Sequence, residues 1–215
     1  MGSPGDCGYY PIFLDLRGQS CLVVGGGAVA ARKAKGLRSA GASVTVVAPM
    51  IDERLKTDPQ LRVCERPFRT ADLHGMTVVI AATDDAVLNR TVARDARDLD
   101  ILVNVVDCPS LCSFILPANL KLGPVQVSIS TAGTSPTLAR KLRDRVAESI
   151  GPEFGVLAEL LGEVRARAVE GVSDPTRRAN LFDRLTDEHF LVLIREGSTD
   201  QARAEMRKLI DDNVS

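Results

Sequence analysis

Aromatic side chains and net charge are both scarce in this sequence of 215 residues. Tryptophan is absent, aromatic residues make up 4% of the chain, and 27 Lys and Arg balance 28 Asp and Glu to a formal net charge of -1. Nucleic-acid binders usually carry basic patches, often with aromatic platforms, and anionic membranes attract clusters of cations. The composition therefore argues against both partners, and an anionic ligand must meet a local group of cations.

Long apolar runs are absent too. No segment is apolar enough to span a bilayer, and residues Met1 to Tyr10 lack the basic and apolar stretches of a secretion signal. The five cysteines are an odd number spread along the chain, unlike a dense extracellular disulfide framework. We therefore expect a cytoplasmic protein with reduced thiols at Cys7, Cys21, Cys64, Cys108 and Cys112.

Metal ligands are few. Cys108 and Cys112 are close enough in the sequence to hold one metal ion together, but Pro109 between them breaks helical geometry. The two histidines offer little support, because His189 lies in an apolar, helix-like stretch and His74 precedes a glycine in a turn-like one. We predict no metal site.

The most informative stretch is a glycine turn that joins an apolar strand to a helix. Cys21 to Val24 lead into Gly25, Gly26 and Gly27, and Ala30 completes a G-x-G-x-x-A pattern. The first glycine permits the tight turn, the second allows close approach of a pyrophosphate, and the small third residue lets the helix pack on the strand. The free amides and positive dipole end of the helix would face phosphates. The pattern predicts a dinucleotide site; the alternative is a plain strand-to-helix turn.

Apolar strands alternate with amphipathic helices over the first half of the chain. Such alternation predicts an α/β fold with a doubly wound parallel sheet. Residues 9–16 read as a short edge or lead-in strand, and Gly41 as the cap that ends the first helix. The expected strands are 20–24, 43–47, 61–65, 77–82 and 101–106, and the expected helical segments are 29–40, 70–73 and 86–99.

The rhythm changes after Asp107. Residues 125–130 alternate apolar and polar side chains, which predicts a half-exposed strand suited to a small extra sheet or a subunit contact. Ser135 can cap, and Pro136 can begin, a helix over 137–150. Gly151-Pro152 marks a boundary, after which the pattern is helical to the end, with breaks at 171–175 and 196–198.

Several separate motifs follow one another along the chain. They are Val24-Gly25-Gly26-Gly27, Val29-Ala30 with Arg32-Lys33, Ala82-Thr83-Asp84-Asp85, Asn104-Val105-Val106-Asp107, Ser113-Phe114 and Ser130-Thr131-Ala132-Gly133-Thr134-Ser135-Pro136. Together they resemble the precorrin-2 dehydrogenase family, which includes the dehydrogenase/ferrochelatase portion of sirohaem synthases. The resemblance runs from Tyr10 into the terminal helices. It implies a Rossmann-type NAD-binding domain over 1–113, a small α+β dimerisation segment over 114–150 and an all-helical C-terminal domain over 151–215.

The resemblance also implies an activity. Members oxidise precorrin-2 to sirohydrochlorin with NAD+, and some also insert ferrous iron to form sirohaem. It implies a homodimer with precorrin-2 as the small-molecule substrate, and a separate chelatase as partner is compatible with the sequence. The alternative from another functional class is a non-catalytic module that senses NAD or a tetrapyrrole and acts through a partner.

Asp107 is the expected catalytic residue, because it matches the acid that the family ties to catalysis. Independently of the resemblance, a carboxylate beyond the end of a parallel strand lies in the crevice where open α/β sheets bind ligands. Loss of a hydride from a macrocycle also requires a proton to leave, and a carboxylate can accept it. The alternative is that Asp107 only begins an Asx turn ahead of Pro109.

Other cofactor contacts are expected near the glycine turn. Ala28 and Val29, together with Pro49 and Met50, match positions that contact NAD in the family. The strand before Pro49 lacks the acid that usually binds the ribose 2'-hydroxyl, so the preference for NAD over NADP rests on the resemblance. A loop acid, Asp52 or Glu53, could make that contact or be merely solvated.

Thr83 and Asp84 end another expected strand and are assigned to the cofactor pocket. The alternative is that Asp84 or Asp85 simply caps the next helix.

A hydroxyl-rich loop before the 137–150 helix is the expected substrate contact, since helix N-termini favour anions and precorrin-2 carries many carboxylates. Arg140 on that helix, with its cationic neighbours, could pair with those carboxylates, although a solvated cationic face is the alternative. In some sirohaem synthases the position of Thr131 is a serine linked to phosphorylation or substrate contact. The expected loop contacts are Ser130, Thr131, Thr134 and Ser135.

Overall fold

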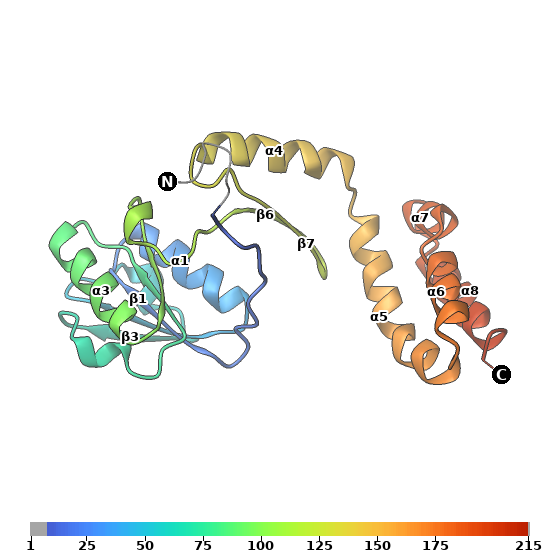
Figure 1. Cartoon of the computed structure of the whole chain (residues 1–215), viewed down its shortest axis with the longest axis horizontal. Helices are drawn as coiled ribbons and strands as arrows, with labels where there is room; N and C mark the ends of the chain where they lie inside the picture. The colour runs from blue at the N-terminus through green and yellow to red at the C-terminus, as the bar shows by residue number, and fades with distance from the viewer. Residues whose placement is uncertain (1–7, 215) are drawn as a thin grey trace. The chain divides into compact units, whose positions relative to one another are not determined.

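A computed structural model describes residues 8–214 of the chain (Figure 1). Cys7 lies outside this range, and the four described cysteines form no disulfide. The chain divides into two compact units, with the boundary between Leu116 and Pro117. Each unit is described by itself.

The first unit is built on a five-stranded, fully parallel sheet in the order β3-β2-β1-β4-β5. The doubly wound α/β prediction is confirmed, and the strands and helical segments predicted between residues 20 and 106 agree with the observed ones to within one or two residues. The strands are β1 (Ser20–Val24), β2 (Ser43–Ala48), β3 (Leu61–Glu65), β4 (Val78–Ala81) and β5 (Leu102–Val105); the helices are α1 (Ala28–Ser39), α2 (Glu53–Lys56) and α3 (Ala86–Asp98), with 3-10 turns η1 (Thr70–Leu73) and η2 (Pro109–Leu111).

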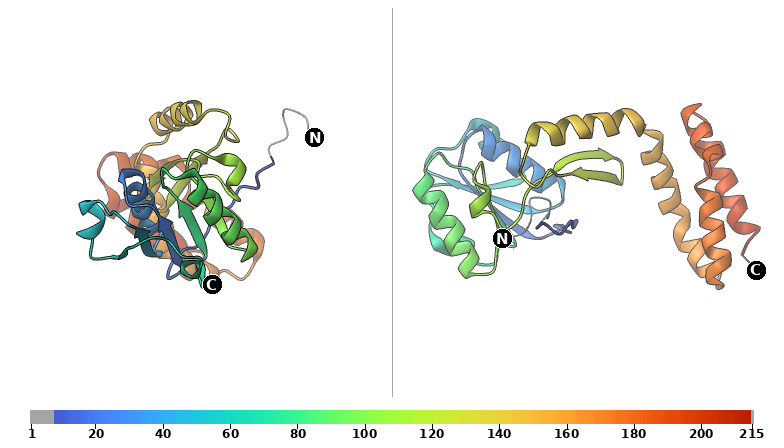
Figure 2. Two further views of the ribbon diagram at one scale, coloured as in Figure 1. Left: turned by 90° about the vertical axis from the view of Figure 1, so that its left-hand side faces the viewer. Right: turned by 45° about the horizontal axis from the view of Figure 1, so that its top comes forward.

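The sheet is covered on both faces, which explains its continuously apolar strands. Side chains alternate across β1: Cys21 and Val23 enter the core under α1, whereas Leu22 and Val24 enter the core under α3. Figure 2 shows helices on both sides of the sheet. Helix α1 ends as predicted at Gly41, where the backbone has φ +83° and donates to Arg38 O at 2.8 Å.

The predicted lead-in strand over residues 9–16 is wrong. The segment has no regular secondary structure, and the side chains of Tyr10 and Phe13 are 87% and 69% exposed. β-prone residues need a neighbouring strand, and this segment pairs with none in the described part of the chain. Leu16 alone is buried there, and it joins the core under α1.

The second unit begins with an antiparallel hairpin, β6 (Ala118–Leu122) and β7 (Val125–Ile129), followed by α4 (Pro136–Ser149). The predicted half-exposed strand is β7, and its partner β6 was not predicted. Ser135 caps α4 and Pro136 opens its first turn, as expected.

Four further helices form a bundle around a separate apolar core that includes Leu160, Leu185 and Met206. The predicted breaks at 171–175 and 196–198 are confirmed. A third break was missed at Thr186-Asp187, where the Asp187 side chain caps the next helix. None of the described helices is long and apolar enough to cross a membrane. The helices are α5 (Glu153–Gly171), α6 (Pro175–Leu185), α7 (Glu188–Arg195) and α8 (Thr199–Asp211).

Candidate active site

The glycine turn is pressed between the ends of its neighbouring strands. Gly25 has φ +130°, and a Cβ there would lie 2.2 Å from Ala82 O, just beyond β4. A Cβ on Gly26 would lie 1.9 Å from Met50 O, just beyond β2. Real Cβ atoms do not approach backbone oxygens so closely, so both positions require glycine for packing alone.

Gly27 differs from its two neighbours because nothing lies within 4 Å of the position its Cβ would occupy. It is the N-cap of α1, and it has no side chain to hydrogen-bond the amides of the first turn. That turn also contains no acidic residue. An open, uncapped helix N-terminus next to a glycine fits a pyrophosphate, which would accept hydrogen bonds from the free amides.

The loop after β2 borders this turn. Pro49 and Met50 are exposed, and the Met50 side chain is 83% accessible. Asp52 N donates to Gly26 O at 2.8 Å, while the Asp52 carboxylate caps α2 and binds the Arg54 guanidinium at 2.9 and 2.8 Å. Hydrogen bonds from Arg54 hold the pKa of Asp52 well below its usual range. The Asp52 carboxylate is thus already paired with Arg54, whereas the Glu53 side chain is 81% exposed.

Thr83 beyond β4 is held by a buried amide. Its hydroxyl donates to Asn89 Oδ1 at 2.7 Å, and Asn89 Nδ2 donates back to Thr83 O at 2.9 Å. The N-cap of α3 is Asp85, whose carboxylate accepts from Val87 N and Leu88 N. Asp84 is therefore not the cap, and it is exposed beside this fixed turn. The role of Asn89, which is only 8% exposed, was not predicted from the sequence.

Asp107 follows β5 in a left-handed conformation with φ +57°. Aspartate tolerates this region better than most residues, often with help from a local side-chain hydrogen bond. Here the exposed carboxylate accepts no hydrogen bond from residues 8–214, so it does not form the Asx turn that was the alternative to a functional role. Asp107 is left free for an external proton or ligand.

Side chains of the next segment fasten it back onto β5. Ser113 Oγ accepts from Val103 N at 2.8 Å, and Asn104 Nδ2 donates to Phe114 O at 3.0 Å. Cys112 Sγ accepts from Val105 N at 3.2 Å, and burial raises the pKa of this thiol. Asn104, Cys112 and Ser113 thus explain structurally why an N-V-V-D sequence is followed by S-F. In the sequence, the family motifs include Asn104 and Ser113, whereas nothing pointed to this role of Cys112.

All these groups of the first unit meet at one edge because every strand of the sheet is parallel. The turns after β1, β2, β4 and β5 emerge at the carboxyl edge, which is where open α/β sheets bind ligands. This edge combines free helix amides with an unbonded carboxylate, so it can hold a phosphate-containing cofactor and accept a proton. The predicted residues collected here are Gly25, Gly26, Gly27, Ala28, Val29, Pro49, Met50, Thr83, Asp84 and Asp107.

The predicted substrate loop belongs to the second unit. Thr131 Oγ1 donates to Ser135 O at 3.0 Å and accepts from Ser135 N at 3.1 Å. Ser130 Oγ accepts from Ala132 N, and Ser135 Oγ accepts from Leu138 N at 3.2 Å as the cap of α4. Three of the four hydroxyls therefore shape the loop itself. Thr134 is exposed there.

Arg140 on α4 is exposed and donates to Thr137 Oγ1 at 3.2 Å. This bond lies within a single helix turn, so the guanidinium keeps donors for another acceptor.

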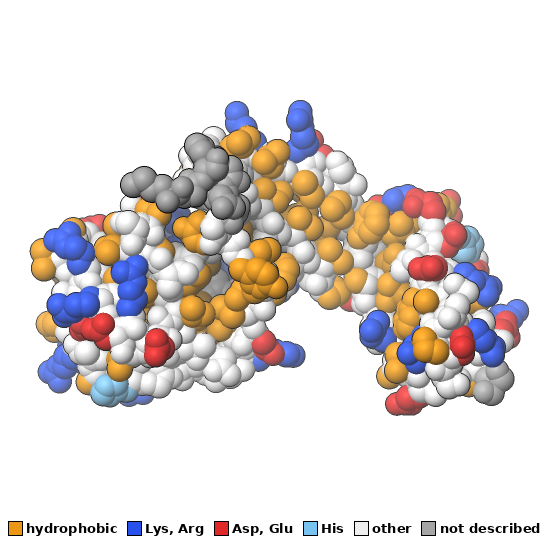
Figure 3. All heavy atoms as spheres, viewed as in Figure 1, with side chains coloured by type: hydrophobic (Ala, Val, Ile, Leu, Met, Phe, Trp, Pro, Cys, Tyr) orange, Lys and Arg blue, Asp and Glu red, His pale blue; other side chains and the backbone are white. Residues whose placement is uncertain are grey.

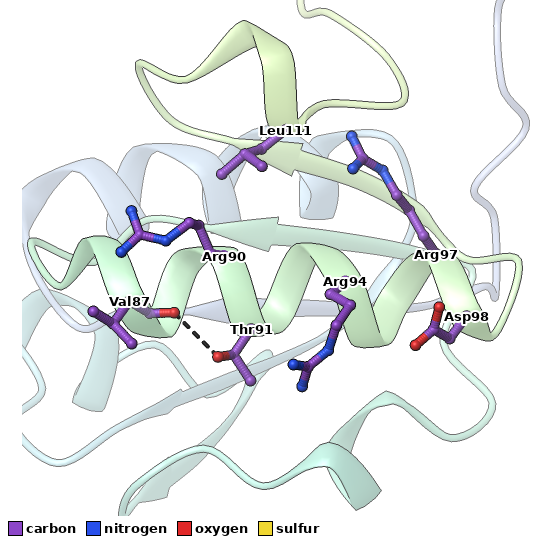
Figure 4. A pocket seen from close by; sticks show the side chains of 7 residues that line it. All are labelled: Val87, Arg90, Thr91, Arg94, Arg97, Asp98 and Leu111. Carbon is purple, nitrogen blue, oxygen red and sulfur yellow. Dashed lines mark hydrogen bonds between the residues drawn. The ribbon is translucent and has the colours of Figure 1, made fainter.

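A hollow of about 430 Å³ lies on the outer face of α3 (Figure 4). Leu111 of η2 lines this hollow together with Arg90 and Arg97 of α3, and Arg97 Nη2 donates to Ser110 O at 3.2 Å. Arg94 is paired with Asp95 at 2.7 Å. None of the predicted site residues lines this hollow, and the exposed arginine stripe is typical of a solvated helix face.

Three family models match consecutive parts of the chain. The first, described as "Putative NAD(P)-binding", matches residues 12–118; the second, "Sirohaem biosynthesis protein central", matches 123–149; the third, "Sirohaem synthase dimerisation region", matches 153–210. The chain belongs to the sirohaem synthase family. The resemblance found in the sequence is thereby confirmed.

Individual relatives agree with this assignment. The siroheme synthase of Methylococcus capsulatus is 41% identical over 206 residues, which cover 94% of this chain and 44% of the relative. That of Thioalkalivibrio sulfidiphilus is 40% identical over 209 residues, which cover 96% of this chain and 43% of the relative. The chain thus spans less than half the length of these sirohaem synthases.

A solved structure of the family, titled SirC, precorrin-2 dehydrogenase, is similar over almost the whole chain. The TM-score is 0.77 at 27% sequence identity, covering 95% of this chain and 100% of SirC. The similarity extends beyond the parallel sheet into the second unit.

Proposed function

We propose that this protein oxidises precorrin-2 to sirohydrochlorin with NAD+. One observation carries the proposal: the chain matches the full length of a precorrin-2 dehydrogenase, not only its nucleotide-binding part. The carboxyl edge supports it chemically, because free amides follow β1 and a free carboxylate follows β5 at the same edge of one parallel sheet.

The cofactor would be held mainly by backbone. The amides after Gly27, at Ala28 and Val29, would bind the pyrophosphate, while Gly25 and Gly26 keep the turn tight. Pro49 and Met50 would border one side, and Thr83 with Asp84 the other. When bound, NAD+ supplies the hydride acceptor.

Asp107 would supply the base. Oxidation of precorrin-2 removes one hydride and one proton, and the carboxylate oxygen of Asp107 takes the proton while the hydride leaves. Its freedom from intramolecular hydrogen bonds leaves both oxygens available for this transfer.

Substrate carboxylates would contact the hydroxyl loop of the second unit. Thr134 and Arg140 are the exposed donors on this segment. The loop itself is held in shape by hydrogen bonds of Ser130, Thr131 and Ser135. Hydroxyls and a guanidinium are suitable donors for carboxylates.

The protein would act as a homodimer, with residues 114–150 as the dimerisation segment. Hydrophobic side chains lie at the surface of the hairpin and of α4 (Figure 3), including Leu138 at 48% and Leu142 at 39% exposure. A two-stranded hairpin is marginally stable by itself and gains from a partner surface. The match of residues 153–210 to a sirohaem synthase dimerisation region supports the homodimer, although these residues lie in the helical bundle that follows 114–150.

An anaerobic assay tests the function. Purified protein is mixed with precorrin-2 and NAD+, and the appearance of NADH and of the sirohydrochlorin spectrum is followed before Fe2+ or Co2+ is added as a second substrate. NADH and sirohydrochlorin without faster metal insertion would identify a dehydrogenase that needs a separate chelatase. Insertion above the rate without protein would identify a bifunctional enzyme. Bound NAD without either product would overturn the proposal and favour a sensor.

A further inference from the structure

Strand β5 lies at the edge of the parallel sheet, and within residues 8–214 no strand pairs with its outer side. Two adjacent side chains of the following segment bind the backbone there instead. Ser113 Oγ lies 2.8 Å from Val103 N and 3.2 Å from Val103 O. Cys112 Sγ lies 3.2 Å from Val105 N and 3.3 Å from Val105 O. Each side chain thus accepts from one amide and donates to one carbonyl, two strand positions apart.

Asp107 lies in a tight turn that begins where β5 ends. Cys108 N donates to Val105 O at 3.3 Å, which closes a β-turn over residues 105–108. Asp107 has φ +57°, whereas Val106 before it has a negative φ, so the signs are those of a type II turn. Glycine or asparagine is usual at the third position of such a turn. An aspartate persists there only where the surrounding structure holds the backbone.

Cys112 is the side chain that spans this turn. Its thiol donates to Val105 O at 3.3 Å and to Cys108 O at 3.4 Å, so one proton is shared between the first and last carbonyls of the turn. The same sulfur accepts from Val105 N at 3.2 Å. Thiol hydrogen bonds are weak individually, but together these join both ends of the turn to one half-buried atom that packs against the apolar cluster of Val105. The Ser113 hydroxyl binds Val103, outside the turn.

We propose that Cys112 is a positioning residue whose thiol holds the Asp107 turn closed and thereby aims the carboxylate at the substrate. The thiol itself takes no part in the reaction. Because the Asp107 carboxylate accepts no hydrogen bond from residues 8–214, its position depends on the backbone that carries it. A catalytic group misplaced by about 1 Å can lose about 10²-fold in rate. This role rests on the proposed function of the site.

Cys112→Val separates hydrogen bonding from packing, since valine is apolar and similar in size but has no polar atom. We expect kcat with precorrin-2 and NAD+ to fall about tenfold. The KM for NAD+ should stay within about twofold of wild type, because the amides at the start of α1 are untouched. Cys112→Ser keeps a donor and an acceptor, so its kcat should remain within about threefold of wild type.

Ser113→Ala is the matched control. It removes the same pair of hydrogen bonds from the same edge of β5, but at Val103 rather than at the turn. Its kcat should stay within about twofold of wild type. An equal fall of kcat in Ser113→Ala and Cys112→Val would mean that any loosening of the segment slows the enzyme, and it would overturn a specific role of the thiol.

A double variant distinguishes positioning of the base from a general loss of structure. In an Asp107→Asn background there is no base to position, so adding Cys112→Val should lower the residual turnover by less than about twofold. A further tenfold loss in that background would show that Cys112 acts otherwise than through Asp107, and it would overturn the proposal.

Amide hydrogen exchange reports on the turn without substrate. The Cys108 amide closes the turn, and it should exchange about tenfold faster in Cys112→Val. In Ser113→Ala the Cys108 amide should keep its wild-type rate, while the Val103 amide exchanges faster. Wild-type exchange at Cys108 in Cys112→Val, or wild-type kcat in that variant, would overturn the role of the thiol. Faster Cys108 exchange in Cys112→Val, in a protein whose wild type forms no NADH, would overturn the proposed function alone.

Discussion

The two units treat the polar groups of their predicted ligand sites in opposite ways. In the first unit, the amides at the start of α1 are uncapped and the Asp107 carboxylate is unbonded. In the second, Ser135 caps α4, and Thr131 bonds to the backbone of Ser135 in both directions. Both helices have the same positive N-terminal dipole, so the dipole alone does not identify an anion site. The first unit leaves amide donors and a carboxylate acceptor free for a ligand, whereas most hydroxyls of the second unit's loop form hydrogen bonds within that loop.

The strongest contrast is expected at Asp107. Asp107→Asn removes the proton acceptor but keeps a residue type that tolerates positive φ, so turnover should fall by about 10² to 10⁴-fold while folding is unchanged. Anaerobic NADH formation and thermal unfolding measure the two effects, and NAD affinity by calorimetry should match wild type. Turnover within tenfold of wild type would show that Asp107 is not the base.

The next largest effect should come from Gly26→Ala. Its Cβ would collide with Met50 O, and the backbone must move to relieve the contact, so we expect a loss of about 3 kcal/mol in the free energy of unfolding. Denaturant titration measures the loss. Gly36→Ala is the control, because its Cβ meets nothing within 4 Å in the middle of α1 and should stabilise the protein by about 0.5 to 1 kcal/mol. Equal free energies of unfolding for the two variants would mean that the backbone of the turn moves to accommodate the methyl group without loss of stability.

Gly27→Ala separates binding from packing. Open space surrounds this position, so the free energy of unfolding should change by no more than about 0.5 kcal/mol. The added methyl group would stand where the pyrophosphate approaches, and NAD affinity should fall about tenfold. Calorimetric titration with NAD+ measures it. If Gly27→Ala binds NAD+ with wild-type affinity, the pyrophosphate does not bind next to Gly27.

The smallest effect should come from Ser135→Ala in the second unit. Loss of the cap on α4 should lower stability by about 1 kcal/mol, and NAD affinity should remain unchanged because the amides of α1 are untouched. Unfolding and NAD titration of the same sample test both statements. Weaker NAD binding in this variant would contradict the division of roles between the two helix starts.

Most of the first unit could be predicted from the sequence. Its strands are apolar throughout, its helices are amphipathic, and Gly25 to Gly27 stand at the junction where the pattern changes. Local rules decide such elements, because a strand buried on both faces has no polar positions to obscure its limits. The strand prediction for residues 9–16 was wrong because local sequence does not decide such an edge segment. A β-prone sequence forms a strand only if a neighbouring strand offers free backbone groups.

The site was predicted less completely. Asn89 and Cys112 escaped the prediction because each acts through a contact that only the folded chain creates: Asn89 with Thr83, and Cys112 with Val105 at the end of β5. An Asx turn at Asp107 was the alternative in the sequence, and the placement of its carboxylate distinguishes it from a free side chain. Whether such side chains form hydrogen bonds depends on how the elements pack against one another.

Periodicity, glycine placement and ordered motifs in the chain determined the doubly wound sheet, the position of the glycine turn between β1 and α1, and membership of the family. These features follow from local backbone sterics and from which side chains avoid water, both of which are properties of neighbouring residues. The tertiary structure decided which polar groups stay free. Whether an amide, a hydroxyl or a carboxylate meets an internal partner depends on distances between segments far apart in the chain, and those distances arise only when the sheet and its helices pack together.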